Sequence, residues 1–220
     1  FLRPVSQSEL GEDGQPKRGG FLPPVELPRR MWAGGRIIFH APIALDAVIE
    51  RRSTIKDVSA KTGATGNMVF VTVSHKIFAG NGLAISEEQD IVFRDMPKAP
   101  LPPGNPDART AKRTRGVTPD PTLLFRFSAL TFNAHRIHYD RDYARNVEAY
   151  PGLVVQGPLI ALLLMDHYLR ANPAARISAF AFRAQRPLFD TAPFDLCLAG
   201  NDLWAVNAQR ETAFTATVSE

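Results

Sequence analysis

Cysteine is nearly absent from this chain of 220 residues, since Cys197 is the only one. A single cysteine excludes an internal disulfide. Cys197 lies in an apolar run with Phe194, Leu196 and Leu198, which favours a buried structural thiol over a nucleophile. Because 45% of the residues are hydrophobic, the chain can bury a sizeable core, either as one large domain or as two small ones.

Long apolar runs are also missing. The longest candidate, residues 159–165, is followed directly by Asp166 and His167, and it is much shorter than the ~20 residues that a membrane-spanning helix needs. No apolar segment with a small-residue cleavage site follows Phe1, which is not typical of secretion. We therefore expect a cytoplasmic protein, or one of the mitochondrial matrix in a eukaryote, with no membrane partner.

Nucleic-acid motifs are missing as well, although the net charge of +4 would suit an anionic partner. The densest basic run is Arg109, Lys112, Arg113 and Arg115. It has no interleaved aromatic residues, and the chain has no zinc-finger or glycine-rich phosphate-loop spacing. The run lies in residues 96–121, which are rich in proline, glycine and charge. We interpret this stretch as a solvated linker, with recognition of an anionic group such as a nucleotide phosphate as the alternative.

The stretches on either side of this linker can be compared. The sequence from Phe39 aligns with that from Phe182 if two residues are inserted, and both read as strand, turn and strand, which suggests a duplication. Only the second half has a convincing long helix, starting near Pro158 and stopping at Asn172. Its apolar residues surround most of its circumference, so a curved antiparallel sheet should wrap it. Residues 1–30 are too rich in proline and glycine to be its equivalent, so the first half has either lost this helix or keeps it upstream.

Most of the chemistry is concentrated in "TFNAHRIHYD", residues 131–140. This stretch contains two of the five histidines and lies between two apolar stretches. Its polar side chains are Asn133, His135, His138, Tyr139 and Asp140.

A helix in a curved sheet, preceded by a polar Asn/His loop, resembles the hotdog fold of the MaoC-like enoyl-thioester hydratases. The segments "PRRMWAGGRIIFHAPI", "VFVTVSHKIF", "LLFRFSALTFNAHRIHYDRDYA" and "YPGLVVQGPLIALLL" are similar to double-hotdog hydratases of the mesaconyl-C4-CoA type. The type 2 hydroxyacyl-thioester dehydratases share the second-half pattern. The resemblance implies an α+β double hotdog with a degenerate N-terminal hotdog at 1–100, a linker at 101–119 and a catalytic hotdog at 120–220.

The residues can be checked against the chemistry of adding water to a double bond conjugated to a thioester. This reaction needs a base, an acid and donors for the enolate oxygen. His138 suits the first two tasks, because an imidazole can be neutral at working pH, accept a proton and return it. Gly157, at the helix start, is our candidate oxyanion donor, although a glycine kept only for the tight turn is the alternative.

The wider family's loop reads Asp-x-Asn-Pro-x-His, and this chain departs from it. Superposition on "NAHRIH" places Asn133 at the aspartate and His135 at the asparagine. An amide cannot accept the proton that a carboxylate can, so Asn133 is assigned to orienting the water. His135 could bind backbone, and Asp140 could orient an imidazole.

The substrate-binding candidates are His135, Gln156, Tyr139, Arg183 and Arg186. Core packing is the alternative for Tyr139, and a place at the sheet rim is the alternative for the two arginines. A metal site at His135 and His138 is disfavoured, because the hydratase loop uses no metal. We expect no cofactor, a coenzyme A thioester as substrate, and either a monomer or a homodimer. The alternatives are a dehydratase acting on acyl-carrier-protein substrates, a hotdog thioesterase and a non-catalytic acyl-thioester-binding module.

Overall fold

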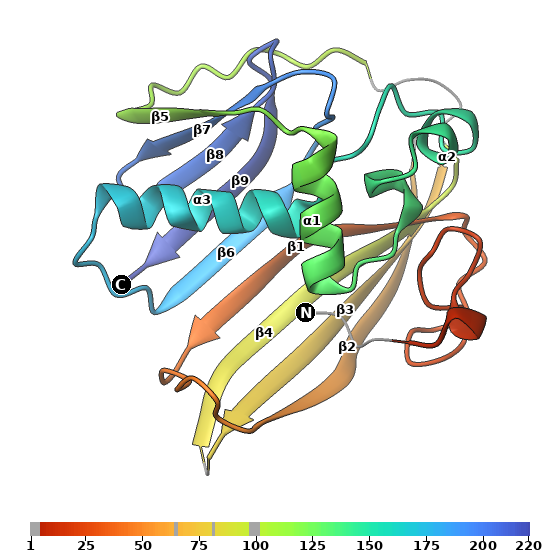
Figure 1. Cartoon of the computed structure of the whole chain (residues 1–220), viewed down its shortest axis with the longest axis horizontal. Helices are drawn as coiled ribbons and strands as arrows, with labels where there is room; N and C mark the ends of the chain where they lie inside the picture. The colour runs from red at the N-terminus through yellow and green to blue at the C-terminus, as the bar shows by residue number, and fades with distance from the viewer. Residues whose placement is uncertain (1–4, 64–65, 81, 97–101) are drawn as a thin grey trace.

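The structure is a computed structural model that describes residues 5–63, 66–80, 82–96 and 102–220. In these residues one nine-stranded antiparallel sheet has the order β2-β3-β4-β1-β6-β9-β8-β7-β5 (Figure 1). The strands are β1 (Arg29–Phe39), β2 (Ile49–Gly63), β3 (Gly66–Ala79), β4 (Gly82–Arg94), β5 (Arg113–Val117), β6 (Ala179–Ala184), β7 (Phe194–Ala199), β8 (Asp202–Val206) and β9 (Thr212–Ser219).

The two halves of the sheet meet where β1 pairs with β6, with Gly35 opposite Phe182 and Ile37 opposite Phe180. Outward from this seam, the order β1-β4-β3-β2 is mirrored by β6-β9-β8-β7. Such mirrored order is what two copies of one unit related by a two-fold axis produce. The sheet is therefore a double hotdog, and the expected fold class is confirmed. The division at residues 100 and 120 stays a prediction.

The long helix α3 (Gly157–Ala171) lies across β7, β8 and β9 (Figure 1). Pro158 is in its first turn and Asn172 is its C-cap, as the sequence predicts. Leu159, Ile160 and Leu164 are buried in the main core, against strand residues such as Phe180 and Phe214. The sheet packs against the inner side of this helix, as the sequence predicts, whereas Leu162 on the outer side is 59% exposed. The sheet curves around only one side of the helix.

The first half has an irregular cover where the second half has α3. Between residue 5 and β1 the only helical element is the short 3-10 turn η1 (Gln7–Glu9), in agreement with the sequence. Leu22, Val25 and Leu27 instead pack on Val71, Val73 and Phe93 of the sheet. Their backbone is held by the guanidinium of Arg18, which donates hydrogen bonds to the carbonyls of Val25 and Leu27 at 2.7 and 2.6 Å.

The predicted linker contains structure of its own, because Arg113–Val117 within it form β5 and pair with β7. Two residues of the basic run contact the second half: Arg115 forms an ion pair with Asp166 of α3 at 2.7 Å, and Arg109 lies over the Trp204 ring. Residues 113–117 are therefore not a solvated tether, because β5 pairs with β7 and extends the sheet beyond it. Cys197 is buried beside Trp204, as expected.

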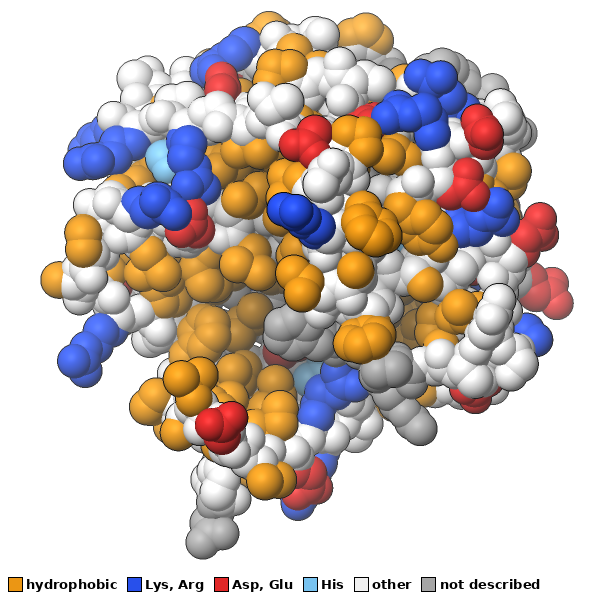
Figure 2. All heavy atoms as spheres, in the orientation of Figure 1, with side chains coloured by type: hydrophobic (Ala, Val, Ile, Leu, Met, Phe, Trp, Pro, Cys, Tyr) orange, Lys and Arg blue, Asp and Glu red, His pale blue; other side chains and the backbone are white. Residues whose placement is uncertain are grey.

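Large apolar side chains remain exposed around the helix α1 (Pro121–Thr131) and on α3. Figure 2 shows exposed apolar side chains in this region of the surface. The most exposed here are Phe125, Leu130, Phe132 and Leu162. Among the described residues, the longest apolar helix is too short to span a bilayer.

Candidate active site

The catalytic candidates lie in a loop that is fixed at both ends by helix caps. Phe132, the C-cap of α1, donates its backbone N–H to the carbonyls of Ala129 and Ser128. After α1, Phe132 turns the chain with a φ of 53°, and the 3-10 turn η2 (Arg136–His138) follows. The next helix, α2 (Arg141–Asn146), starts at Asp140, whose carboxylate accepts from the Tyr143 N–H at 3.0 Å. The caps therefore hold residues 133–138 in a defined conformation.

His138 is buried, with 7% of its surface exposed. Its Nδ1 lies 2.7 Å from the Val154 carbonyl oxygen, which can only accept, so Nδ1 carries the proton. Nε2 is then the free acceptor of a neutral ring, and it has no hydrogen-bond partner among the described residues. Burial lowers the pKa of His138 to about 4, partly opposed by the bond to Val154. His138 is therefore neutral at pH 7 and can accept a proton at Nε2.

Asn133 and His135 support this histidine from the same loop. The Asn133 Oδ1 accepts the backbone N–H of His135 at 3.2 Å, which leaves the amide N–H groups of Asn133 to face a ligand or water. The rings of His135 and His138 meet edge to face with centroids 5.4 Å apart. The pKa of His135 is well below its usual value, because the ring is buried and lies near His138 and Arg30. Two neutral imidazoles therefore lie side by side.

Gly157 begins α3, and its N–H belongs to the first turn, where no helical carbonyl can accept it. A Cβ at this position would lie 3.1 Å from Cε3 of Trp32, which comes from β1 in the first half of the chain. Val154, the partner of His138, is three residues before Gly157. The site is therefore built at the junction of both halves, between the loop, the start of α3 and Trp32.

Four further candidates have other contacts. Gln156 is fully buried, and its amide donates to the Leu124 carbonyl and Ser128 Oγ at 2.9 and 3.0 Å, which ties α1 to α3. Tyr139 is 44% exposed, so packing in the core was wrong, and its hydroxyl donates to the Ala134 carbonyl. Arg183 is exposed on β6, and Arg186 holds the Pro102 carbonyl at 2.9 Å.

Asp140 does not orient an imidazole, in contrast to the suggestion from the sequence. Its carboxylate is occupied by the α2 cap and by an ion pair with Arg136 at 2.7 Å. The side chain of His135 makes no hydrogen bond to backbone within the described part of the chain, so that expectation was also wrong. Over the same ranges no group of three or more His, Cys, Asp or Glu is placed to hold a metal ion.

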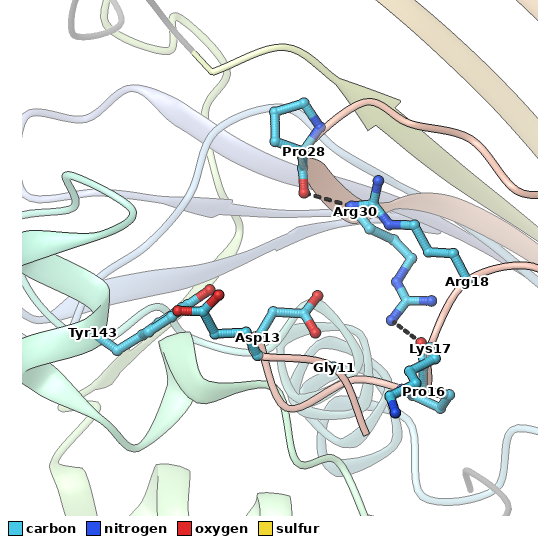
Figure 3. Close-up of a pocket in the computed structure, with 9 residues that line it drawn as sticks. Gly11, Asp13, Pro16, Lys17, Arg18, Pro28, Arg30 and Tyr143 are labelled. Atoms are coloured by element: carbon cyan, nitrogen blue, oxygen red, sulfur yellow. Dashed lines mark hydrogen bonds between the residues drawn. The ribbon is translucent and has the colours of Figure 1, made fainter. Parts of the chain in front are cut away.

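One part of the site could not be read from the sequence, namely the N-terminal segment 11–16. The Asp13 carbonyl accepts the Arg136 N–H at 2.8 Å, and a Cβ at Gly14 would lie 1.9 Å from the Ala134 oxygen. This segment therefore rests directly on the catalytic loop. It also lines a cavity of about 400 Å³ with Arg18, Arg30 and Tyr143 (Figure 3). A glycine in a turn such as "GEDGQP" is too common a signal to reveal a contact 120 residues away.

Comparison with known proteins agrees with this architecture. The hydroxyacyl-thioester dehydratase type 2 family model matches residues 1–190. The chain is 50% identical to the mesaconyl-C(4)-CoA hydratase of Chloroflexus aurantiacus over 225 residues, covering 99% of this chain and 80% of that protein. It is 28% identical to the mitochondrial hydroxyacyl-thioester dehydratase type 2 of Schizosaccharomyces pombe, covering 90% of this chain and 75% of that protein.

Two solved structures share the fold. One is a MaoC-like dehydratase with a TM-score of 0.69 and 13% identity, covering 89% of this chain and 76% of that chain. The other is a Mycobacterium tuberculosis protein described as a double hotdog, with a TM-score of 0.57 and 12% identity, covering 85% of this chain and 73% of that chain. The family match and the relative at 50% identity show that this chain belongs to the hydroxyacyl-thioester dehydratase type 2 family of hydro-lyases.

Proposed function

We propose that the protein catalyses the reversible hydration of a 2-enoyl-CoA to a 3-hydroxyacyl-CoA. The observation that carries the proposal is His138, a buried neutral imidazole whose tautomer is fixed by Val154 and whose Nε2 is free to take a proton. Because the relative at 50% identity is a mesaconyl-C(4)-CoA hydratase, we also propose a short branched or dicarboxylic acyl group for this chain.

In the hydration direction, Nε2 of His138 accepts a proton from water as the water oxygen bonds to carbon three of the acyl group. The electrons of the double bond move to carbon two and the thioester carbonyl, giving an enolate. The Gly157 N–H and the positive end of the α3 dipole stabilise the enolate oxygen. His138 then returns the proton to carbon two, so that one water is added in total. Asn133 orients the water through its free amide N–H groups.

We propose that this reaction uses neither a metal nor a redox cofactor. Addition of water transfers no electrons to or from an external acceptor, and the proposed acid, base and oxyanion donor all come from the chain. Activity that survives treatment with a chelator would agree with this. Activity that is lost with a chelator and restored by one metal would overturn it.

The protein acts, in this proposal, in the cytoplasm and as a homodimer. We propose that a second copy of the chain covers the exposed apolar side chains on α1 and α3. Phe125 and Leu162 are each about 60% exposed, and large exposed apolar patches mark interfaces. Sedimentation velocity of the wild type and of Phe125→Ser/Leu162→Ser tests this. A wild type that sediments as a monomer would contradict it.

The test of the proposed function is the ultraviolet band of the conjugated enoyl thioester, followed while thiol release is measured in parallel. We expect the band to disappear with crotonyl-CoA and mesaconyl-C4-CoA without free thiol. Release of thiol would identify a thioesterase instead. An unchanged band with retained binding would identify a binding module, and activity restricted to thioesters of acyl carrier protein would identify the alternative substrate.

A further inference from the structure

Arg30 lines the cavity and also lies near His135 of the catalytic loop. The cavity of about 400 Å³ is bordered by Lys17, Arg18 and Arg30 and by the carboxylates of Glu12 and Asp13, which gives a net charge of +1. Figure 3 shows Arg30 and Arg18 on one side of it and Asp13 and Tyr143 on the other. Such a balance favours an anionic ligand group over a neutral one.

The guanidinium of Arg30 has unused donors. Among the described residues its side chain donates one hydrogen bond, to the Pro16 carbonyl at 3.3 Å, and its Nε is buried with no acceptor there. No carboxylate forms an ion pair with it over those residues. By contrast, the three carbonyls of Val25, Leu27 and Pro28 occupy Arg18. A guanidinium that is partly buried and incompletely bonded is well suited to bind a carboxylate.

The position of Arg30 relative to the catalytic residues follows from strand geometry. Arg30 and Trp32 are two residues apart on β1, before its bulge, so both side chains point to the same face, about 6.6 Å apart along the strand. Trp32 contacts Gly157, whereas Arg30 is close enough to His135 to lower its pKa. Trp32 therefore lies against the start of α3, whereas Arg30, on the same face of β1, lies near His135 of the catalytic loop.

We infer that Arg30 binds a carboxylate at the far end of the acyl group, so that the site selects enoyl-CoA substrates derived from dicarboxylic acids. This inference rests on the proposed function. With the thioester oxygen at the Gly157 N–H and the reacting carbon at His138, a short acyl chain extends past His135 toward Arg30. A terminal carboxylate there completes the hydrogen bonds of the guanidinium, whereas a methyl group leaves them unmade.

The test compares fumaryl-CoA, the monothioester, with crotonyl-CoA, because these differ only in a carboxylate or a methyl group at carbon four. We expect Arg30→Gln to lower kcat/KM for fumaryl-CoA by about 10- to 100-fold and to leave crotonyl-CoA nearly unchanged. Arg30→Lys should retain part of the preference. The matched control is Arg36→Gln on the same strand, whose guanidinium faces the opposite side and is held by Asp90 at 2.7 Å. An equal loss for both substrates, or an unchanged preference, would overturn the inference.

Binding of saturated analogues separates this inference from the proposed chemistry. Calorimetry with succinyl-CoA and butyryl-CoA requires no turnover. Preference for succinyl-CoA that disappears in Arg30→Gln supports the carboxylate site even if no hydration is observed. Hydration of crotonyl-CoA together with equal binding of both analogues would leave the proposed function standing and overturn the role of Arg30.

Discussion

The two halves of this molecule share one sheet plan but differ in what covers the sheet. In the second half a regular helix, α3, lies on short strands, and its N-terminus faces the catalytic loop. In the first half the strands β2 to β4 have 13 to 15 residues each, and an irregular segment covers them. A helix N-terminus provides free N–H groups, whereas an irregular segment bound through its own carbonyls does not. This difference supports the proposal that the chemistry takes place in the second half.

The first half contributes to the site nevertheless. The Trp32 ring packs against Gly157, and the segment 11–16 packs on the catalytic loop. The first half therefore provides a wall and a support for the proposed site.

The largest change in kcat is expected at His138, and the buried histidine of the first half, His75, should show almost none. His138→Gln should lower kcat by about 10²- to 10⁴-fold, because it removes the proton carrier. The matched control is His75→Gln, since His75 is also buried but is bonded to Ser53 Oγ at 2.7 Å in the first half. It should leave kcat within a few fold. A similar loss in both variants would place the chemistry outside the loop.

The next largest change in kcat tests whether the N-terminal segment 11–16 supports the catalytic loop. Gly14→Ala places a Cβ against the Ala134 oxygen and should shift the catalytic loop, lowering kcat by about 100-fold, as displacements near 1 Å do. Gly19→Ala is the matched control, because its φ of 81° equals that of Gly14 within a degree and its nearest contact, Pro24, is 3.7 Å away. Equal kinetics in both variants would show that the segment is only a cover.

The amide of Gln156 should affect stability rather than substrate binding. Gln156→Ala leaves the Leu124 carbonyl and Ser128 Oγ without their donor and should lower the free energy of unfolding by about 1–3 kcal/mol. Urea denaturation measures this, with Gln185→Ala on the exposed surface as the control. A raised KM with unchanged stability would restore Gln156 as a substrate contact.

A smaller effect is expected at the junction of the halves. Gly157→Ala keeps the N–H but places a Cβ 3.1 Å from Trp32, so kcat should fall by about 10-fold, less than full removal of an oxyanion donor. Trp32→Phe, combined with it, should recover part of this loss by making room. If Gly157→Ala is fully active, the close contact between Gly157 and Trp32 is not needed for the reaction.

The smallest expected change is in kcat/KM as the pH is lowered. Because burial lowers the pKa of His138 to about 4, the ring stays neutral as the pH falls from 7 to 5.5. The value of kcat/KM should therefore change by less than about twofold, whereas a base with the ordinary pKa near 6.5 would be mostly protonated at pH 5.5. A pH profile of crotonyl-CoA hydration measures this. A decline centred near pH 6.5 would show that His138 is solvated in the working enzyme.

Local signals predicted much of this structure. Pro158 and Asn172 mark the ends of α3, and the polar loop between apolar stretches contains His138. Contacts between distant segments could not be predicted. Nothing in the sequence near Gly14 or Arg30 indicates residues more than 100 positions away, and no local pattern distinguishes a Gln156 that binds a neighbouring helix from one that binds substrate. β5 was missed because its sequence, RTRGV, contains one apolar side chain and becomes a strand only by pairing with β7.

The most direct test of the central claim is a reaction of crotonyl-CoA in ¹⁸O-labelled water, analysed by mass spectrometry. The account predicts one ¹⁸O on carbon three of an intact 3-hydroxyacyl-CoA with the wild type and His75→Gln, and incorporation at least about 100-fold slower with His138→Gln. Label found in a free carboxylate, or incorporation into carbon three at an unchanged rate in His138→Gln, would contradict it.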